Sequence, residues 1–170
     1  MNFFLDTEFI DGPDKLELIS IALVAESGRE YYAVSNEFDE SKASEWVKQN
    51  VLTKLPHKRE WKSRLTISKE LRSFIDSNRC GEYAEFYAYF ASCDWILFYK
   101  LFGYSLLDLP DGYFQYCHDL MSLMHLNNIQ RLPPPKGNHD ALVDARWNLK
   151  VFRHIQDKLK YTNAFQRIDR

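Results

Sequence analysis

The pattern of apolar and polar residues along the chain predicts the order of its strands and helices. Apolar, β-prone runs bounded by turn residues such as Gly12-Pro13 and Ser27-Gly28 predict strands. These strands are expected at residues 2–9, 16–26, 30–35, 84–90 and 114–118. Apolar residues at helical spacing predict helices, with Ser41 expected to cap the first. The helices are expected at residues 41–52, 66–78, 92–102, 119–126 and 140–158.

This order of elements defines the expected fold class. Three strands joined by short turns come first, which predicts an antiparallel meander, and the later strands alternate with helices. The chain is therefore expected to form an α/β fold with a mixed five-stranded sheet flanked by helices. Its 170 residues suit a single domain over residues 1–170, and a hydrophobic content of 45% indicates a globular chain rather than a disordered one.

The charges are distributed unevenly, although the formal net charge is only −2. Residues 1–40 hold ten acidic side chains against Lys15 and Arg29, a net charge of −8. Residues 131–170 hold nine basic side chains against four aspartates, a net charge of +5. An acidic end and a basic end suit a protein that handles cations and anions in one place, and two separate solvated surfaces are the simpler alternative.

The cysteines and the apolar runs bear on the expected compartment. The three cysteines form no Cys-x-x-Cys pair, so free thiols of a cytoplasmic protein are expected rather than disulfides or a zinc site. No basic region precedes Phe3, and Asp6 interrupts the first apolar run, which argues against a signal peptide. The longest fully apolar run, residues 86–91, is too short to span a bilayer, so no membrane partner is expected.

Two carboxylates interrupt the apolar first strand. Side chains two apart on a strand point to the same face, so Asp6 and Glu8 are expected to project together about 6–7 Å apart. Two like charges at that spacing repel, and a divalent cation between them removes the repulsion. Mg²⁺ and Mn²⁺ prefer oxygen ligands, so this pair is a candidate metal site. A strand end whose acids reach water is the alternative.

A second candidate group lies near the start of the last predicted helix. His139 and Asp144 are five residues apart, which would place them about 140° apart within one helix. They can act together only if His139 precedes the helix, and Gly137-Asn138 and a capping Asp140 favour that arrangement. Histidine titrates near neutral pH, so His139 is a candidate general base. A surface histidine and a helix N-terminal acid are the alternatives.

A third carboxylate, Asp94, follows the apolar run over residues 86–91. It is expected in the first turn of the next helix, at the edge of the sheet where α/β proteins commonly bind ligands. Stabilisation of the helix N-terminus is the alternative role. Asp108, Asp111 and Asp119 are weaker candidates because they lie in expected loops or after the later strand.

Together these residues resemble the active-site motifs of the DEDDh family of 3′–5′ exonucleases. Asp6-Thr7-Glu8, Asp94 and the His139-x₄-Asp144 spacing occur in the order and setting of that family. The chain is more narrowly similar to the bacterial polyadenylate-specific 3′-exoribonucleases of the RNase AS type. This narrower similarity is carried by Asp-Thr-Glu-Phe-Ile, Glu-Leu-Ile-Ser-Ile, Glu-Tyr-Tyr-Ala-Val-Ser and His-Asp-Ala-Leu-Val-Asp-Ala-Arg.

The resemblance implies a ribonuclease H-like fold, a homodimer and two Mg²⁺ or Mn²⁺ ions in each active site. It assigns Asp6 to both ions, Glu8 and Asp144 to the ion that carries the attacking water, and Asp94 to the other ion. It also assigns the role of general base to His139.

The resemblance further implies how the substrate end is held. The main chain near Glu8 would contact the 3′-hydroxyl, and Phe9 would pack against the terminal base or sugar. Ordinary core packing is the alternative for Phe9. His139, as the base, would also lie against the substrate.

The implied activity is metal-dependent 3′–5′ hydrolysis of single-stranded RNA to nucleoside monophosphates, with A-rich 3′ tails as a candidate substrate. Phe9-Ile10 stands where the larger proofreading enzymes commonly have Thr-Gly, which favours the RNase AS branch. Two alternatives remain open: a 3′–5′ exodeoxyribonuclease acting on single-stranded DNA, and an inactive nucleic-acid-binding module that has kept the fold.

Overall fold

The computed structural model describes residues 1–13 and 15–168, with side chains described as far as residue 160. Its centre is a five-stranded sheet in the order β3-β2-β1-β4-β5. β1, β2 and β3 are antiparallel neighbours, whereas β4 runs parallel to β1 and β5 runs parallel to β4. The strands are β1 (Asn2–Asp11), β2 (Leu16–Ala25), β3 (Glu30–Val34), β4 (Ala84–Ala88) and β5 (Tyr113–Asp119). The predicted mixed sheet, which is consistent with a ribonuclease H-like fold, is confirmed.

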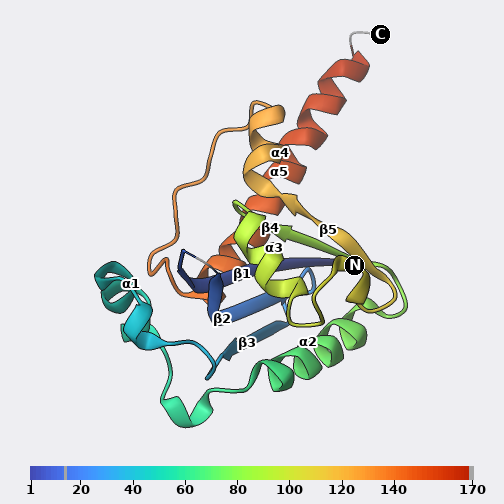
Figure 1. Cartoon of the computed structure of the whole chain (residues 1–170). Coiled ribbons are helices and arrows are strands. Elements are labelled where there is room, and N and C mark those ends of the chain that lie inside the picture. Colours follow the sequence, from blue (N-terminus) through green and yellow to red (C-terminus); the bar gives the residue numbers. More distant parts are fainter. Residues whose placement is uncertain (14, 169–170) are drawn as a thin grey trace.

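Helices cover both faces of this sheet (Figure 1). α2 and α3 pack on one face against Phe3, Leu5 and Phe86, and α4 and α5 pack on the other against Phe4 and Tyr87. The alternating side chains of β1 therefore reach both layers of the core. The helices are α1 (Glu45–Asn50), α2 (Arg64–Arg79), α3 (Ser92–Tyr99), α4 (Leu120–Leu126) and α5 (Ala141–Ile168). In the part of the chain that the structure describes, no helix has the length and apolar character needed to cross a bilayer.

The first predicted helix begins later than expected. Ser41 does not cap it, because Asp39 accepts hydrogen bonds from both the main-chain N–H and the hydroxyl of Ser41 and closes a short 3₁₀ turn, η1 (Glu40–Lys42). The chain is extended at Ala43, and α1 then starts behind Ser44, whose hydroxyl oxygen accepts the N–H of Val47 at 3.2 Å. The predicted cap was wrong because the Ser41 hydroxyl donates to Asp39, which caps a separate turn before α1.

The sheet opens where the candidate site lies. Pairing between β1 and β4 covers Asn2 to Phe4, and beyond that point the carbonyl of Leu5 accepts a hydrogen bond from the Asn148 side chain of α5 at 2.8 Å. The register of β1 on β2 also shifts between Glu8 and Phe9. The two parallel strands therefore separate at their carboxyl ends, which is the position where open α/β sheets place ligands.

Candidate active site

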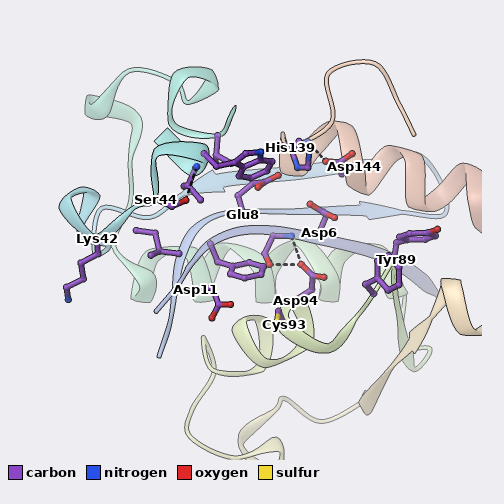
Figure 2. Close-up of a pocket in the computed structure, with 17 residues that line it drawn as sticks. Asp6, Glu8, Asp11, Lys42, Ser44, Tyr89, Cys93, Asp94, His139 and Asp144 are labelled. Atoms are coloured by element: carbon purple, nitrogen blue, oxygen red, sulfur yellow. Dashed lines mark hydrogen bonds between the residues drawn. The ribbon is translucent and has the colours of Figure 1, made fainter. Parts of the chain in front are cut away.

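A cavity of about 610 Å³ lies at the carboxyl ends of β1 and β4, and it contains all five predicted catalytic side chains (Figure 2). Asp6 and Glu8 project from β1 to the same side, as their spacing predicts. Asp144 reaches them from the first turn of α5. One carboxylate oxygen from each of these three residues lies within 4.8 Å of the others. Acids from two distant parts of the chain are thus brought to one point.

Asp94 enters the cavity from the first turn of α3, where the sequence places it. Its Oδ1 accepts two hydrogen bonds from Thr7, one from the main-chain N–H at 2.8 Å and one from the hydroxyl at 2.6 Å. The Asp94 carboxylate is buried and lies outside the cluster of three oxygens. Thr7, the middle residue of the Asp-Thr-Glu motif, therefore holds Asp94 beside Asp6.

His139 precedes α5, as predicted, and has a left-handed backbone with φ of 63°. Its main-chain N–H donates to Asp144 Oδ2 at 2.7 Å. Asp140 caps the helix by accepting the N–H groups of Leu142 and Val143 at 3.0 and 3.2 Å. The expectation that His139 stands outside the helix, beside Asp144, is confirmed.

Among the described residues, an aromatic ring and a side-chain amide contact the imidazole of His139. It meets the ring of Trp46 edge to face, with 4.7 Å between the ring centres. Its Nε2 lies 3.0 Å from the amide nitrogen of Asn138. An amide nitrogen only donates, so Nε2 is the acceptor in this contact when the ring carries its proton on Nδ1.

All four acids have raised pKa values in the absence of a cation. Burial raises the pKa of Asp6 well above its ordinary range, and the charges of Asp94, Asp144 and Glu8 raise it further. Burial, together with the charge of Asp144, raises the pKa of Glu8 to about 8. Burial raises the pKa of Asp94 to about 6 even though the Thr7 hydrogen bonds oppose it. Burial also raises the pKa of Asp144, against the hydrogen bond from His139. A bound cation would offset the burial and mutual repulsion that raise these four pKa values, so the site favours binding a cation.

A family model described as the 3′–5′ exoribonuclease Rv2179c-like domain matches residues 1–156. This chain belongs to that family. The predicted class of enzyme, a 3′–5′ exonuclease, is confirmed at this level. Two relatives are the 3′–5′ exoribonuclease Rv2179c of Mycobacterium tuberculosis (strain ATCC 25618 / H37Rv) and the 3′–5′ exoribonuclease MT2234.1 of Mycobacterium tuberculosis (strain CDC 1551 / Oshkosh). Each is 41% identical over 158 residues, which cover 91% of this chain and 93% of the relative.

Phe9 packs in the core, and its role against the substrate stays a prediction. Its ring is half-buried against the core layer of α2 and α3, and it also lines the cavity. Asp119, by contrast, has a structural role, since it caps α4 through the N–H of Ser122 and accepts the N–H of Ala91.

Several residues that shape the site were missed by the sequence reasoning. Trp46 of α1 covers the His139 ring, and Lys54 of the 3₁₀ turn η2 (Leu52–Lys54) donates to the carbonyls of Asn138 and His139 at 2.5 and 3.3 Å. The charge of Lys54 opposes part of the rise in the pKa of Glu8. Neither residue belongs to a motif, and only the fold brings residues 46–54 next to residue 139.

Asn148 is a further missed residue, and its contact gives a testable prediction. It is fully buried one helical turn after Asp144, and its amide bonds the Leu5 carbonyl next to Asp6. Asn148→Leu is expected to destabilise the fold by about 1–3 kcal/mol because it leaves that buried carbonyl without a donor. Urea denaturation measures the change.

Asn127→Leu is the matched control, because Asn127 makes the same amide-to-carbonyl bond to Leu123 at an exposed position. Water replaces that bond, so a change within about 0.5 kcal/mol is expected. Equal losses in the two variants would show that the bond to Leu5 has no special importance.

Proposed function

We propose that this protein is a metal-dependent 3′–5′ exoribonuclease that removes nucleoside monophosphates from the 3′ end of single-stranded RNA, with A-rich tails as its candidate substrate. The observation that carries the proposal is the convergence of Asp6, Glu8 and Asp144 in one cavity that also contains Asp94 and His139. This set corresponds to a DEDDh site of the RNase AS type. Membership in an exoribonuclease family supports RNA over DNA as the substrate.

The donor set fits a hard divalent cation such as Mg²⁺ or Mn²⁺. All four acidic side chains offer oxygen ligands, and within the described residues no ion pair joins any of them to a basic side chain. Asp6 would contribute to both of two ions, Glu8 and Asp144 to one, and Asp94 to the other. When bound, such a pair supplies charge stabilisation at phosphorus and at the departing 3′-oxygen and acidifies the attacking water.

The side chains around the acids supply the remaining steps. His139 accepts the proton of the attacking water at its imidazole, which Trp46 and Asn138 contact at the cavity. In-line attack on the last phosphodiester breaks the bond to the 3′-oxygen of the preceding nucleotide and releases a 5′-monophosphate. Phe9 packs against the terminal base or sugar, and the main chain near Glu8 contacts its 3′-hydroxyl. These contacts account for action at a 3′ end.

Degradation of matched oligonucleotides tests the activity. 5′-labelled RNA and DNA strands of one sequence, each with all four 3′-terminal bases, are incubated with Mn²⁺ or Mg²⁺. Stepwise shortening of RNA, fastest with 3′-terminal adenosine, is expected. Preference for DNA would establish the deoxyribonuclease alternative, and binding without cleavage would establish the inactive module.

We also propose that the protein acts as a homodimer, as the RNase AS resemblance implies. Light scattering coupled to size-exclusion chromatography is expected to give twice the 20.2 kDa chain mass. A mass that stays at one chain across micromolar concentrations would refute the dimer.

Metal binding is expected to depend on pH. Glu8 and Asp94, with pKa values raised to about 8 and about 6, must lose their protons before they bind a cation. Affinity for Mn²⁺ should therefore rise between pH 6 and pH 8, and binding at pH 7 should release protons. Calorimetry in two buffers of different ionisation enthalpy measures both effects.

Glu17→Gln provides the control for that titration. Glu17 is a buried carboxylate outside the cavity, and hydrogen bonds from the Asp39 main chain and from two lysines lower its pKa. The variant should bind Mn²⁺ with the same proton release as the parent. An affinity that is independent of pH in the parent would contradict the assignment of the four acids.

A further inference from the structure

We infer that the RNA chain upstream of the scissile bond leaves the active site past Tyr89 and Trp147 and lies in a second, basic groove over α5. This inference rests on the proposed function, and it names the surface that distinguishes a long RNA from a short one. Figure 2 shows Tyr89 on the α5 side of the active-site cavity.

The groove has a volume of about 440 Å³ and lies between α5 and the proline-rich loop before it. Its wall is contributed by Leu132, Pro133, Pro135, Val143 and Trp147, and its cations are Lys136, Arg146 and Lys150. Apolar and aromatic walls with interspersed cations suit single-stranded nucleic acid, which offers base faces and phosphates.

The groove adjoins the active site through one aromatic pair. The ring of Tyr89, which lines the active-site cavity, meets the ring of Trp147 edge to face with 4.8 Å between centres. Val143, on the groove side, directly precedes Asp144 in α5. In this inference, an RNA strand whose 3′ end lies at Asp144 passes this pair to reach the groove.

The loop that forms one side of the groove is held in place. The indole N–H of Trp147 donates to the carbonyl of Pro133 at 2.9 Å, and the run of three prolines restricts the backbone around it. A groove formed in advance binds its ligand with less loss of conformational entropy.

Charge distinguishes this groove from two cavities that share lining residues with the active-site cavity. Arg146 is bonded to Glu30 at 2.7 and 2.6 Å, but Lys136 and Lys150 are exposed and have no ion pair within the described residues. These two ammonium groups can therefore bind phosphates without first giving up an internal partner.

These two cavities lack such free cations. One cavity of about 370 Å³ lies beyond Phe90, and the only charged side chain in its lining is Asp119. Another, of about 430 Å³, has Lys15 and Lys42, but both are bonded to Glu17 at 3.2 and 3.3 Å. A polyanion is repelled by the first and meets neutralised charge in the second, so the groove over α5 is favoured over these two cavities.

The test compares the parent with Lys136→Ala/Lys150→Ala on RNA strands that share one 3′ end but contain two or twelve nucleotides. The measured quantity is the ratio of kcat/KM for the long strand to kcat/KM for the dinucleotide. The ratio is expected to fall about tenfold, and the slope of log(kcat/KM) against log[salt] for the long strand should become about 1.4 less steep, as two lost phosphate contacts predict.

Lys69→Ala/Lys100→Ala is the matched control, because these lysines are exposed on α2 and just after α3, on the opposite face of the sheet. It should keep the parent ratio and the parent salt slope. Lys150→Glu alone should lower the ratio further than Lys150→Ala.

The outcomes separate this inference from the proposed function. If the parent cleaves RNA and the groove variants keep its ratio and its salt slope, the RNA takes another path and the inference is overturned. If the parent cleaves neither length of RNA with any metal, the proposed function itself fails.

Discussion

Asp6→Asn is expected to lower kcat/KM on single-stranded RNA by on the order of 10³-fold or more, because it removes the one carboxylate proposed to contribute to both cations. The asparagine has the shape of aspartate and leaves the strand intact, so the loss reports the missing charge. Single-turnover degradation of a labelled oligonucleotide at saturating Mn²⁺ measures it.

The same substitution should stabilise the metal-free protein. Burial and four neighbouring acids raise the pKa of Asp6, so ionisation disfavours the folded state as the pH rises above the ordinary aspartate range. Asparagine cannot ionise, and at pH 8 the metal-free variant should unfold at a higher temperature than the parent. Mn²⁺ should raise the melting temperature of the parent much more than that of the variant. Activity within tenfold of the parent would contradict the role given to Asp6.

His139→Ala is expected to lower kcat by about 10²–10⁴-fold, the range typical for loss of a general base. Metal binding should survive, because Asp144 is held by the main-chain N–H at residue 139 and not by the imidazole. The acidic limb of the pH–rate profile should also change in the variant. Stopped-time assays across pH 5.5–9 and Mn²⁺ titration of the same sample measure these effects.

His154→Ala is the control for that experiment, since His154 is also on α5 but its imidazole lies against the carbonyl of Gln130. Its kcat should match the parent. If His139→Ala kept both the parent kcat and the parent pH profile, another group would have to accept the proton. If it instead lost Mn²⁺ affinity, the imidazole would have to be a ligand.

The sequence predicts those parts of the molecule in which local pattern decides the structure. Asp6 and Glu8 project together because side chains two apart on a strand point to the same face. His139 precedes the helix because Asp140 caps it. The meander, the alternating second half and the position of Asp94 likewise follow from short-range signals. The order of five strands in the sheet is consistent with those signals.

The parts that the sequence could not predict depend on contacts between distant segments. Trp46 and Lys54 lie more than 80 residues from His139, and no motif marks them. Asn148 bonds Leu5 only because β1 and β4 separate, which no local pattern reveals. Ser41 failed as a cap for a local reason, because its own N–H and hydroxyl donate to Asp39, which caps the turn that contains Ser41.

Diffraction from a crystal soaked in Mn²⁺, recorded at the manganese absorption edge, tests the central claim most directly. Two anomalous peaks about 3.5–4 Å apart are expected. Asp6 should touch both peaks, Glu8 and Asp144 one, and Asp94 the other. A map with no peak among these four side chains, from a crystal whose dissolved protein still degrades RNA, would contradict the account.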